Sequence, residues 1–155
     1  MNMSRITLPQ ANSIEKVMDV VSFVYHNPKS SIEDIAEYIG FTVRQALYYR
    51  DAARYFGLID GQMTPTSKCA DIMSNGGIHF TEGFYECVIK DELFGAVFTK
   101  YALFPECDID KYALDVASIY YPDLATSSTL ARRSHAMVLW AKKILHNIVS
   151  KQIIK

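Results

Sequence analysis

Residues 32–56 contain two helix patterns separated by only three residues, and this feature constrains the fold most. The first pattern places apolar residues on one helical face: Ile32, Ile35, Ala36 and Ile39. Gly40 follows, and glycine tolerates the left-handed backbone that ends many helices. Thr42 is the predicted N-cap of the second helix, residues 43–56. Two helices joined by so short a turn must cross steeply, which is the geometry of a helix-turn-helix.

A short β-hairpin is predicted directly after the second helix. Residues 57–64 form two short stretches joined by Asp60-Gly61, a pair that favours tight hairpin turns. A further helix pattern, with Ser13 as its N-cap, precedes the helix-turn-helix. Three helices followed by a hairpin make a winged helix, and residues 8–77 are predicted to form this unit.

The rest of the chain also has a helical period. Helices are predicted over residues 67–74, 82–104, 109–120 and 129–148, the second with a break near Gly95. The run at residues 75–77 (NGG) interrupts the pattern and marks the start of a second unit, residues 78–155. The predicted fold is mainly α with one small β-hairpin wing, built from tandem winged-helix or helix-turn-helix units.

Composition argues against several other classes of protein. No apolar run reaches the ~18 residues of a membrane span, and the N-terminus has no recognisable signal peptide. The 3 cysteines form no CxxC pair and the 4 histidines are scattered, so we expect no disulfide frame, metal or cofactor. These features favour a cytoplasmic protein that does not bind membranes.

The net charge is only −1, but the charges are unevenly distributed. Residues 81–124 hold nine acids and three bases, whereas residues 125–155 hold six bases and no acid. A local basic surface of this kind is what binding to phosphates requires.

The helix at 43–56 is the first candidate for DNA contact, because the second helix of a helix-turn-helix enters the major groove. Its period buries Ala46, Ala53 and either Tyr49 or the stem of Arg50. The side chains predicted to face bases are Thr42, Arg44, Gln45 and Tyr48. Arginine can read guanine and glutamine can read adenine. Arg50 and Arg54 lie further along and suit phosphates.

The helix at 129–148 is the second candidate, since a short polar turn also precedes it. Its predicted contacts are Ser128, Arg132, Arg133 and His135, with Lys142 and Lys143 on phosphates. Arginines near a helix N-terminus are placed unfavourably in the dipole field, which favours an anionic partner. The alternative is a set of surface ion pairs with the acidic segment 106–115.

Several motifs resemble the winged-helix DNA-recognition region of certain type II restriction endonucleases. They are LPQANS at 8–13, EDIA at 33–36, FTVRQALYY at 41–49 and STLARR at 128–133 with Trp140 seven residues on. The resemblance extends from residue 8 to about residue 145. It implies two recognition units that act with a separate nuclease domain or subunit.

The nuclease of such enzymes needs an Asp followed by Glu/Asp-x-Lys to hold Mg²⁺, and this chain contains no Glu-x-Lys or Asp-x-Lys. We therefore expect a sequence-specific double-stranded DNA-binding module without a catalytic site of its own. Two alternatives are a winged-helix transcriptional regulator that dimerises through its C-terminal helix and a winged-helix module that binds another protein.

Overall fold

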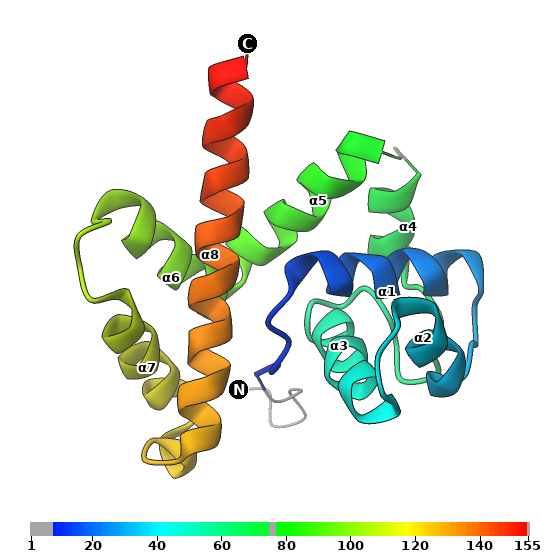
Figure 1. Cartoon of the computed structure of the whole chain (residues 1–155), viewed down its shortest axis with the longest axis horizontal. Helices are drawn as coiled ribbons and strands as arrows, with labels where there is room; N and C mark the ends of the chain where they lie inside the picture. The colour runs from blue at the N-terminus through cyan, green and yellow to red at the C-terminus, as the bar shows by residue number, and fades with distance from the viewer. Residues whose placement is uncertain (1–7, 75–76, 155) are drawn as a thin grey trace. The chain divides into compact units, whose positions relative to one another are not determined.

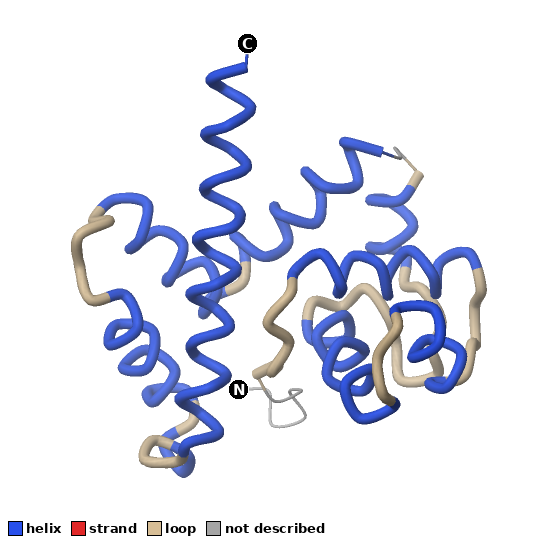
Figure 2. The backbone as a smooth tube through the Cα atoms, in the orientation of Figure 1, coloured by secondary structure: helices blue, strands red, loops and turns tan. Residues whose placement is uncertain are grey.

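A computed structural model describes residues 8–74 and 77–154 of the chain. These residues form mainly α-helices, as predicted, and the chain divides into two compact units after Glu86. The helices are α1 Ile14–His26, α2 Ile32–Ile39, α3 Val43–Tyr55, α4 Ser67–Met73, α5 Gly77–Lys90, α6 Glu92–Leu103, α7 Ile109–Tyr120 and α8 Ser128–Ile154, with a short 3₁₀ turn η1 at Pro122–Leu124 (Figures 1 and 2).

The sequence-based division into residues 8–77 and 78–155 placed all of α5 except its first residue in the second unit. In the structure α5 begins in the first unit and ends in the second. The predicted interruption at residues 75 and 76 lies outside the described residues.

Side-chain caps set the starts of the first three helices, as the sequence predicted. The hydroxyls of Ser13, Ser31 and Thr42 accept the N–H groups of the residues three positions on, at 3.2, 3.1 and 3.1 Å. Gly40 ends α2 in the left-handed conformation, with φ 75°. These local bonds confirm that residues 14–55 form three helices, as predicted.

The core of the first unit lies where α1, α2 and α3 contact one another. Its fully buried members include Val17, Val20, Val24, Ile35, Ala46, Ala52 and Ala53. Small alanines along α3 let this helix approach α1 and α2 closely, because no long side chain separates the backbones. Tyr49 is also buried, and its hydroxyl accepts the N–H of Ser13 at 3.2 Å.

The predicted pair of strands after α3 does not form in the described residues. One isolated antiparallel bridge joins Ile59 to Pro65, and a tight turn lies between them. The Asp60 carboxylate accepts the N–H groups of Gln62 and Thr64 at 2.8 and 3.0 Å. These bonds bend the chain into a loop, and Pro65 has no N–H to extend a ladder. We call residues 58–66 the α3–α4 loop.

Asp60 gives the α3–α4 loop a dependence on pH. The N–H groups of Thr64 and Gln62 hold the pKa of Asp60 below its usual value of 3.8. A carboxylate whose pKa is lower in the folded state stabilises the fold at every pH above its unfolded-state pKa. This contribution is lost as the pH falls through the folded-state pKa. We expect Asp60→Asn to lower the melting temperature slightly at pH 6 and by less at pH 2.5, as followed by circular dichroism. An equal change at both pH values would contradict this origin.

The second unit begins with a helix break that the sequence misplaced. A single helix was predicted over residues 82–104 with a break near Gly95, but the break lies at Asp91. The Asp91 carboxylate accepts the N–H groups of Leu93 and Phe94 at 3.1 and 3.0 Å and so caps α6. Glycine at position 95 lets the start of α6 approach the end of α5, because a Cβ atom there would lie 2.1 Å from the carbonyl oxygen of Ile89.

Helices α6, α7 and α8 contact one another and form the rest of the second unit (Figure 1). Trp140 of α8 is fully buried, with its ring centroid 5.1 Å from that of Phe94 in α6. The buried residues of α8 are Leu130, Ser134, Ala136, Met137, Val138, Trp140, Ala141 and Ile144. Leu145 and Ile148 are half-buried.

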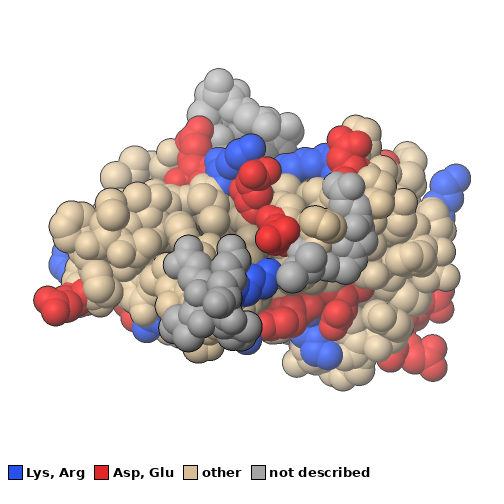
Figure 3. All heavy atoms as spheres, turned by 90° about the horizontal axis from the view of Figure 1, so that it is seen from above, with Lys and Arg blue, Asp and Glu red and all other residues tan. Residues whose placement is uncertain are grey.

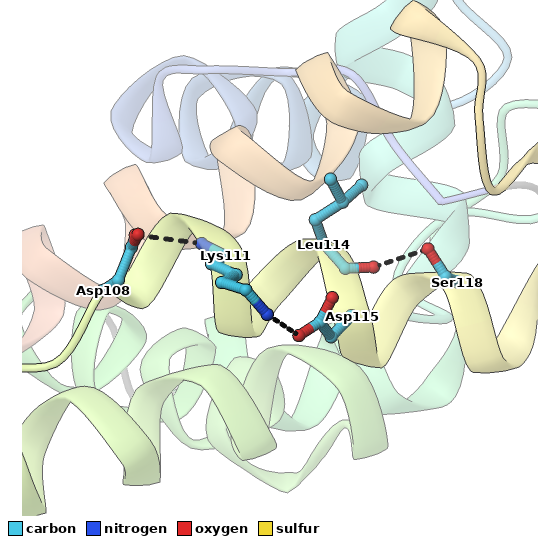
Figure 4. A network of polar contacts seen from close by, with 5 residues as sticks. All are labelled: Asp108, Lys111, Leu114, Asp115 and Ser118. Atoms are coloured by element: carbon cyan, nitrogen blue, oxygen red, sulfur yellow. Dashed lines mark hydrogen bonds and ion pairs between the residues drawn. The ribbon is translucent and has the colours of Figure 1, made fainter.

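The polar contacts of α7 drawn in Figure 4 join residues three or four positions apart. Asp108 caps the helix through the N–H of Lys111 at 3.2 Å, and the Lys111 ammonium pairs with Asp115 at 3.0 Å. Helix α8 continues past its predicted end at residue 148, because no glycine or proline interrupts the chain there. None of the helices in residues 8–74 and 77–154 is both long and apolar enough to cross a membrane.

Candidate nucleic-acid interface

The N-terminal turns of α3 present the residues that the sequence selected as base readers. Thr42, Arg44 and Gln45 are exposed and Tyr48 is half-buried, while Ala46 and Tyr49 face the core. The short turn after α2 fixes this orientation, since it leaves α3 no freedom to roll. The structure therefore brings the four predicted readers together on one end of α3.

Two of these side chains are bonded to each other in a capping box. The Gln45 side-chain oxygen accepts the N–H of Thr42 at 3.0 Å and lies 3.2 Å from the Thr42 hydroxyl. The Thr42 hydroxyl in turn accepts the N–H of Gln45. This reciprocal pair satisfies donors that are otherwise unpaired at a helix start. The Thr42 cap was predicted from the sequence, but the bond from the Thr42 N–H to the Gln45 side chain was not.

Arg44 has a partner one helical turn away. Its Nε–H donates to the Tyr48 hydroxyl at 3.2 Å, and both residues lie on the outer side of α3. The bond uses the Nε–H and leaves the N–H groups of the two terminal nitrogens to donate elsewhere. The bond to Tyr48 therefore holds the Arg44 guanidinium, and its two terminal nitrogens supply the remaining hydrogen-bond donors.

The two arginines predicted to contact phosphates differ in their surroundings. Arg50 donates from Nε and Nη2 to one carboxylate oxygen of Asp51, at 3.0 and 2.8 Å. Arg54 is half-buried, and its Nε has no hydrogen-bond partner among the described residues. The charge of Asp51 partly cancels that of Arg50, so the far end of α3 is less basic than its sequence suggests.

The exposed side of α8 is more uniform in charge. Seven exposed residues recur at helical spacing and share one face, here called the α8 basic face: Ser128, Arg132, His135, Leu139, Lys142, Lys143 and His146. No acid occurs after Asp123, so the face contains none. Eighteen steps of ~1.5 Å give it a length of about 27 Å. The sequence analysis missed Leu139 and His146, although the 3–4 spacing could have identified both.

Contacts around this face separate the two interpretations of its basic residues. The ion pairs between the two arginines and segment 106–115 that we set against DNA binding are not seen in the described residues; instead, His135 Nδ1 lies 2.8 Å from the Asp110 carboxylate. Arg132 contacts only the hydroxyls of Ser128 and Thr129, both at 3.4 Å, among the described residues. The Lys142 ammonium lies 5.8 Å from the centre of the Tyr101 ring.

Arg133 departs from the prediction in its position. It lies off the α8 basic face, is half-buried, and its Nε finds no hydrogen-bond partner in the described part of the chain. On the face of the molecule seen in Figure 3, acids and bases are interspersed. Helix α2 exposes Glu33, Asp34 and Glu37 and carries no base. Phosphates would therefore be repelled by α2 and attracted by the α8 basic face.

The remaining observations concern metal-ligating clusters and the similarity of the chain to known proteins. Within the described residues no three His, Cys, Asp or Glu side chains gather as ligands for a metal ion. A family model described as a domain of unknown function, DUF7226, matches residues 16–149. No curated protein and no solved structure matches the chain.

Proposed function

The chain belongs to the DUF7226 family, whose function is unknown, and we propose that it binds double-stranded DNA. The observation that carries this proposal is the α8 basic face, which is about 27 Å long and to which α8 itself contributes no acid. A DNA duplex carries one phosphate charge per ~1.7 Å of its axis, so a surface of this length can contact several phosphates.

The first unit supplies the second argument for DNA. A steep turn at Gly40 joins α2 to α3, and α3 exposes Arg44 at its N-terminal end. This is the part of a helix-turn-helix that meets base edges in the major groove. In our proposal α3 reads sequence and the α8 basic face binds the backbone. The α3–α4 loop takes the position of a wing.

The broader context follows from the sequence resemblance and stays a prediction. We infer that the chain recognises DNA without cutting it, as the recognition part of a restriction-type system whose nuclease lies elsewhere. The absence of a Glu-x-Lys or Asp-x-Lys motif supports this. Regulation of transcription as a dimer, or binding of a protein, are the competing predictions.

The salt dependence of binding tests the proposal. When the three permanent cations of the α8 basic face contact phosphates, they release counterions from the DNA. A plot of log affinity against log salt concentration should then have a slope of about −2.7. The slope should be steeper if α3 also contacts phosphates. Fluorescence anisotropy with a labelled mixed-sequence duplex, from low to high salt, measures this slope. Vesicles of anionic lipid and an acidic peptide are the comparison ligands. Failure to bind the duplex at low salt would contradict the proposal.

A second prediction concerns the acid on the outer side of α3. Asp51 is 39% exposed and holds Arg50, so its carboxylate opposes any phosphate near this helix. We expect Asp51→Asn to raise duplex affinity about fivefold at low salt, the effect of one opposed charge pair of about 1 kcal/mol in water. Anisotropy titrations measure the change. Asp19→Asn, at an exposed acid on α1, should change the duplex affinity less. Equal effects of the two substitutions would show that α3 does not contact the duplex.

A further inference from the structure

We propose that α3 recognises a guanine through Arg44, with Tyr48 as the residue that positions its guanidinium, and that Gln45 does not read a base. This inference rests on the proposed DNA binding and names what the α3 surface recognises. It follows from the way in which the three polar side chains at the start of α3 are already bonded.

Arg44 is held in a geometry that suits guanine. Its Nε–H is donated to the Tyr48 hydroxyl at 3.2 Å, so the donor pair that stays available is formed by the two terminal nitrogens. Guanine presents two acceptors, O6 and N7, side by side in the major groove, and a guanidinium can bond both. Because Tyr48 is half-buried and one turn away, it can hold Arg44 before DNA binds, which lowers the cost of ordering a long side chain.

Gln45 is committed elsewhere. Reading adenine requires both ends of the glutamine amide, the oxygen to accept from N6 and the nitrogen to donate to N7. In this structure the oxygen already accepts the N–H of Thr42 at 3.0 Å. A turn of the amide toward a base would leave that N–H unpaired at the helix start and break the capping box. Gln45 and Thr42 therefore hold the start of α3 in shape, and Arg44 is its reader.

Selection of bound duplexes from a random pool, followed by competition, tests this assignment. The preferred duplex competes with one in which the contacted G·C pair is replaced by A·T. We expect the intact chain to prefer guanine by about tenfold or more. Arg44→Ala should abolish the preference, and Tyr48→Phe should reduce it severalfold while leaving the salt slope unchanged. Gln45→Ala is the matched control, because it removes the amide that could read adenine without adding a charge, and the Thr42 hydroxyl can still accept the backbone N–H of residue 45.

The outcomes separate this inference from the proposed function. If the intact chain shows no salt-dependent duplex binding, the proposed function itself is wrong. If it binds but selects no guanine, or if Arg44→Ala keeps the preference, the assignment to Arg44 is wrong. A lost preference in Gln45→Ala, with the melting temperature unchanged, would make Gln45 the reader. An unchanged preference in Tyr48→Phe would remove its positioning role.

Discussion

Gly95→Ala is expected to unfold the second unit, or to lower its free energy of unfolding by about 3 kcal/mol or more. The added Cβ would lie 2.1 Å from the carbonyl oxygen of Ile89, well inside van der Waals contact. That oxygen belongs to the backbone at the end of α5, so it cannot rotate away as a side chain could. Gly95 also donates its N–H to the Asp91 carbonyl at 2.7 Å, which ties it to the helix break.

The strain would spread because Gly95 lies in the core. Its neighbours Phe94 and Val97 are fully buried, and Phe94 packs on Trp140. Separating α5 from α6 would therefore also disturb the packing of α8. For a domain of this size, 3 kcal/mol corresponds to a fall of about 12–24 °C in melting temperature.

Fluorescence of the single tryptophan, Trp140, reports on this unit during thermal or urea unfolding. Gly61→Ala makes the same chemical change in the first unit, where the new atom would meet only the Arg54 guanidinium at 3.5 Å, an ordinary contact. It should leave the melting temperature nearly unchanged. If Gly95→Ala were as stable as Gly61→Ala, the close approach of α5 and α6 would be wrong.

Removing the permanent cations of the α8 basic face is expected to have the largest effect on DNA binding. The triple variant Arg132→Gln, Lys142→Gln and Lys143→Gln should make the log–log salt slope shallower by about 2.7, since each lost phosphate contact contributes about 0.9. At 0.1 M salt the affinity should fall by up to a few hundredfold, if release of counterions is the main term. All three residues are exposed, so the fold should tolerate the changes.

Lys111→Gln is the matched control for each single change on α8. Lys111 belongs to the same unit but pairs with Asp115 at 3.0 Å, so its charge is already opposed. We expect it to change the salt slope by less than any one substitution on the α8 basic face. Circular dichroism confirms that every variant folds. An undiminished slope in the triple variant would show that DNA, if bound, contacts another surface.

Much of the helical framework could be predicted from local sequence. Ser13 and Thr42 were predicted as caps, and each accepts an N–H three residues on. Such bonds join residues within one helical turn, so the residues around each cap are enough to predict them. The same locality explains why the ends of α1 to α4 and of α7 lie close to their predicted positions.

The errors arose where two local signals compete. Asp60-Gly61 favours a hairpin, yet the Asp60 carboxylate bonds two backbone N–H groups and closes a loop instead. Gly95 suggested a helix break, but the break needs a capping carboxylate and falls at Asp91. In each case an aspartate side chain satisfied the backbone, and the spacing of apolar residues could not show it.

The sequence by itself determined a mainly helical chain, the helix-turn-helix order around Gly40 and an acid-free basic C-terminal segment. Only the tertiary structure decided which polar side chains stay available on the two candidate surfaces. His135 pairs with Asp110 from 25 positions away, and Lys142 lies over the ring of Tyr101. These pairings depend on how α6 and α7 pack against α8, and such long-range contacts leave no periodic signal in the sequence.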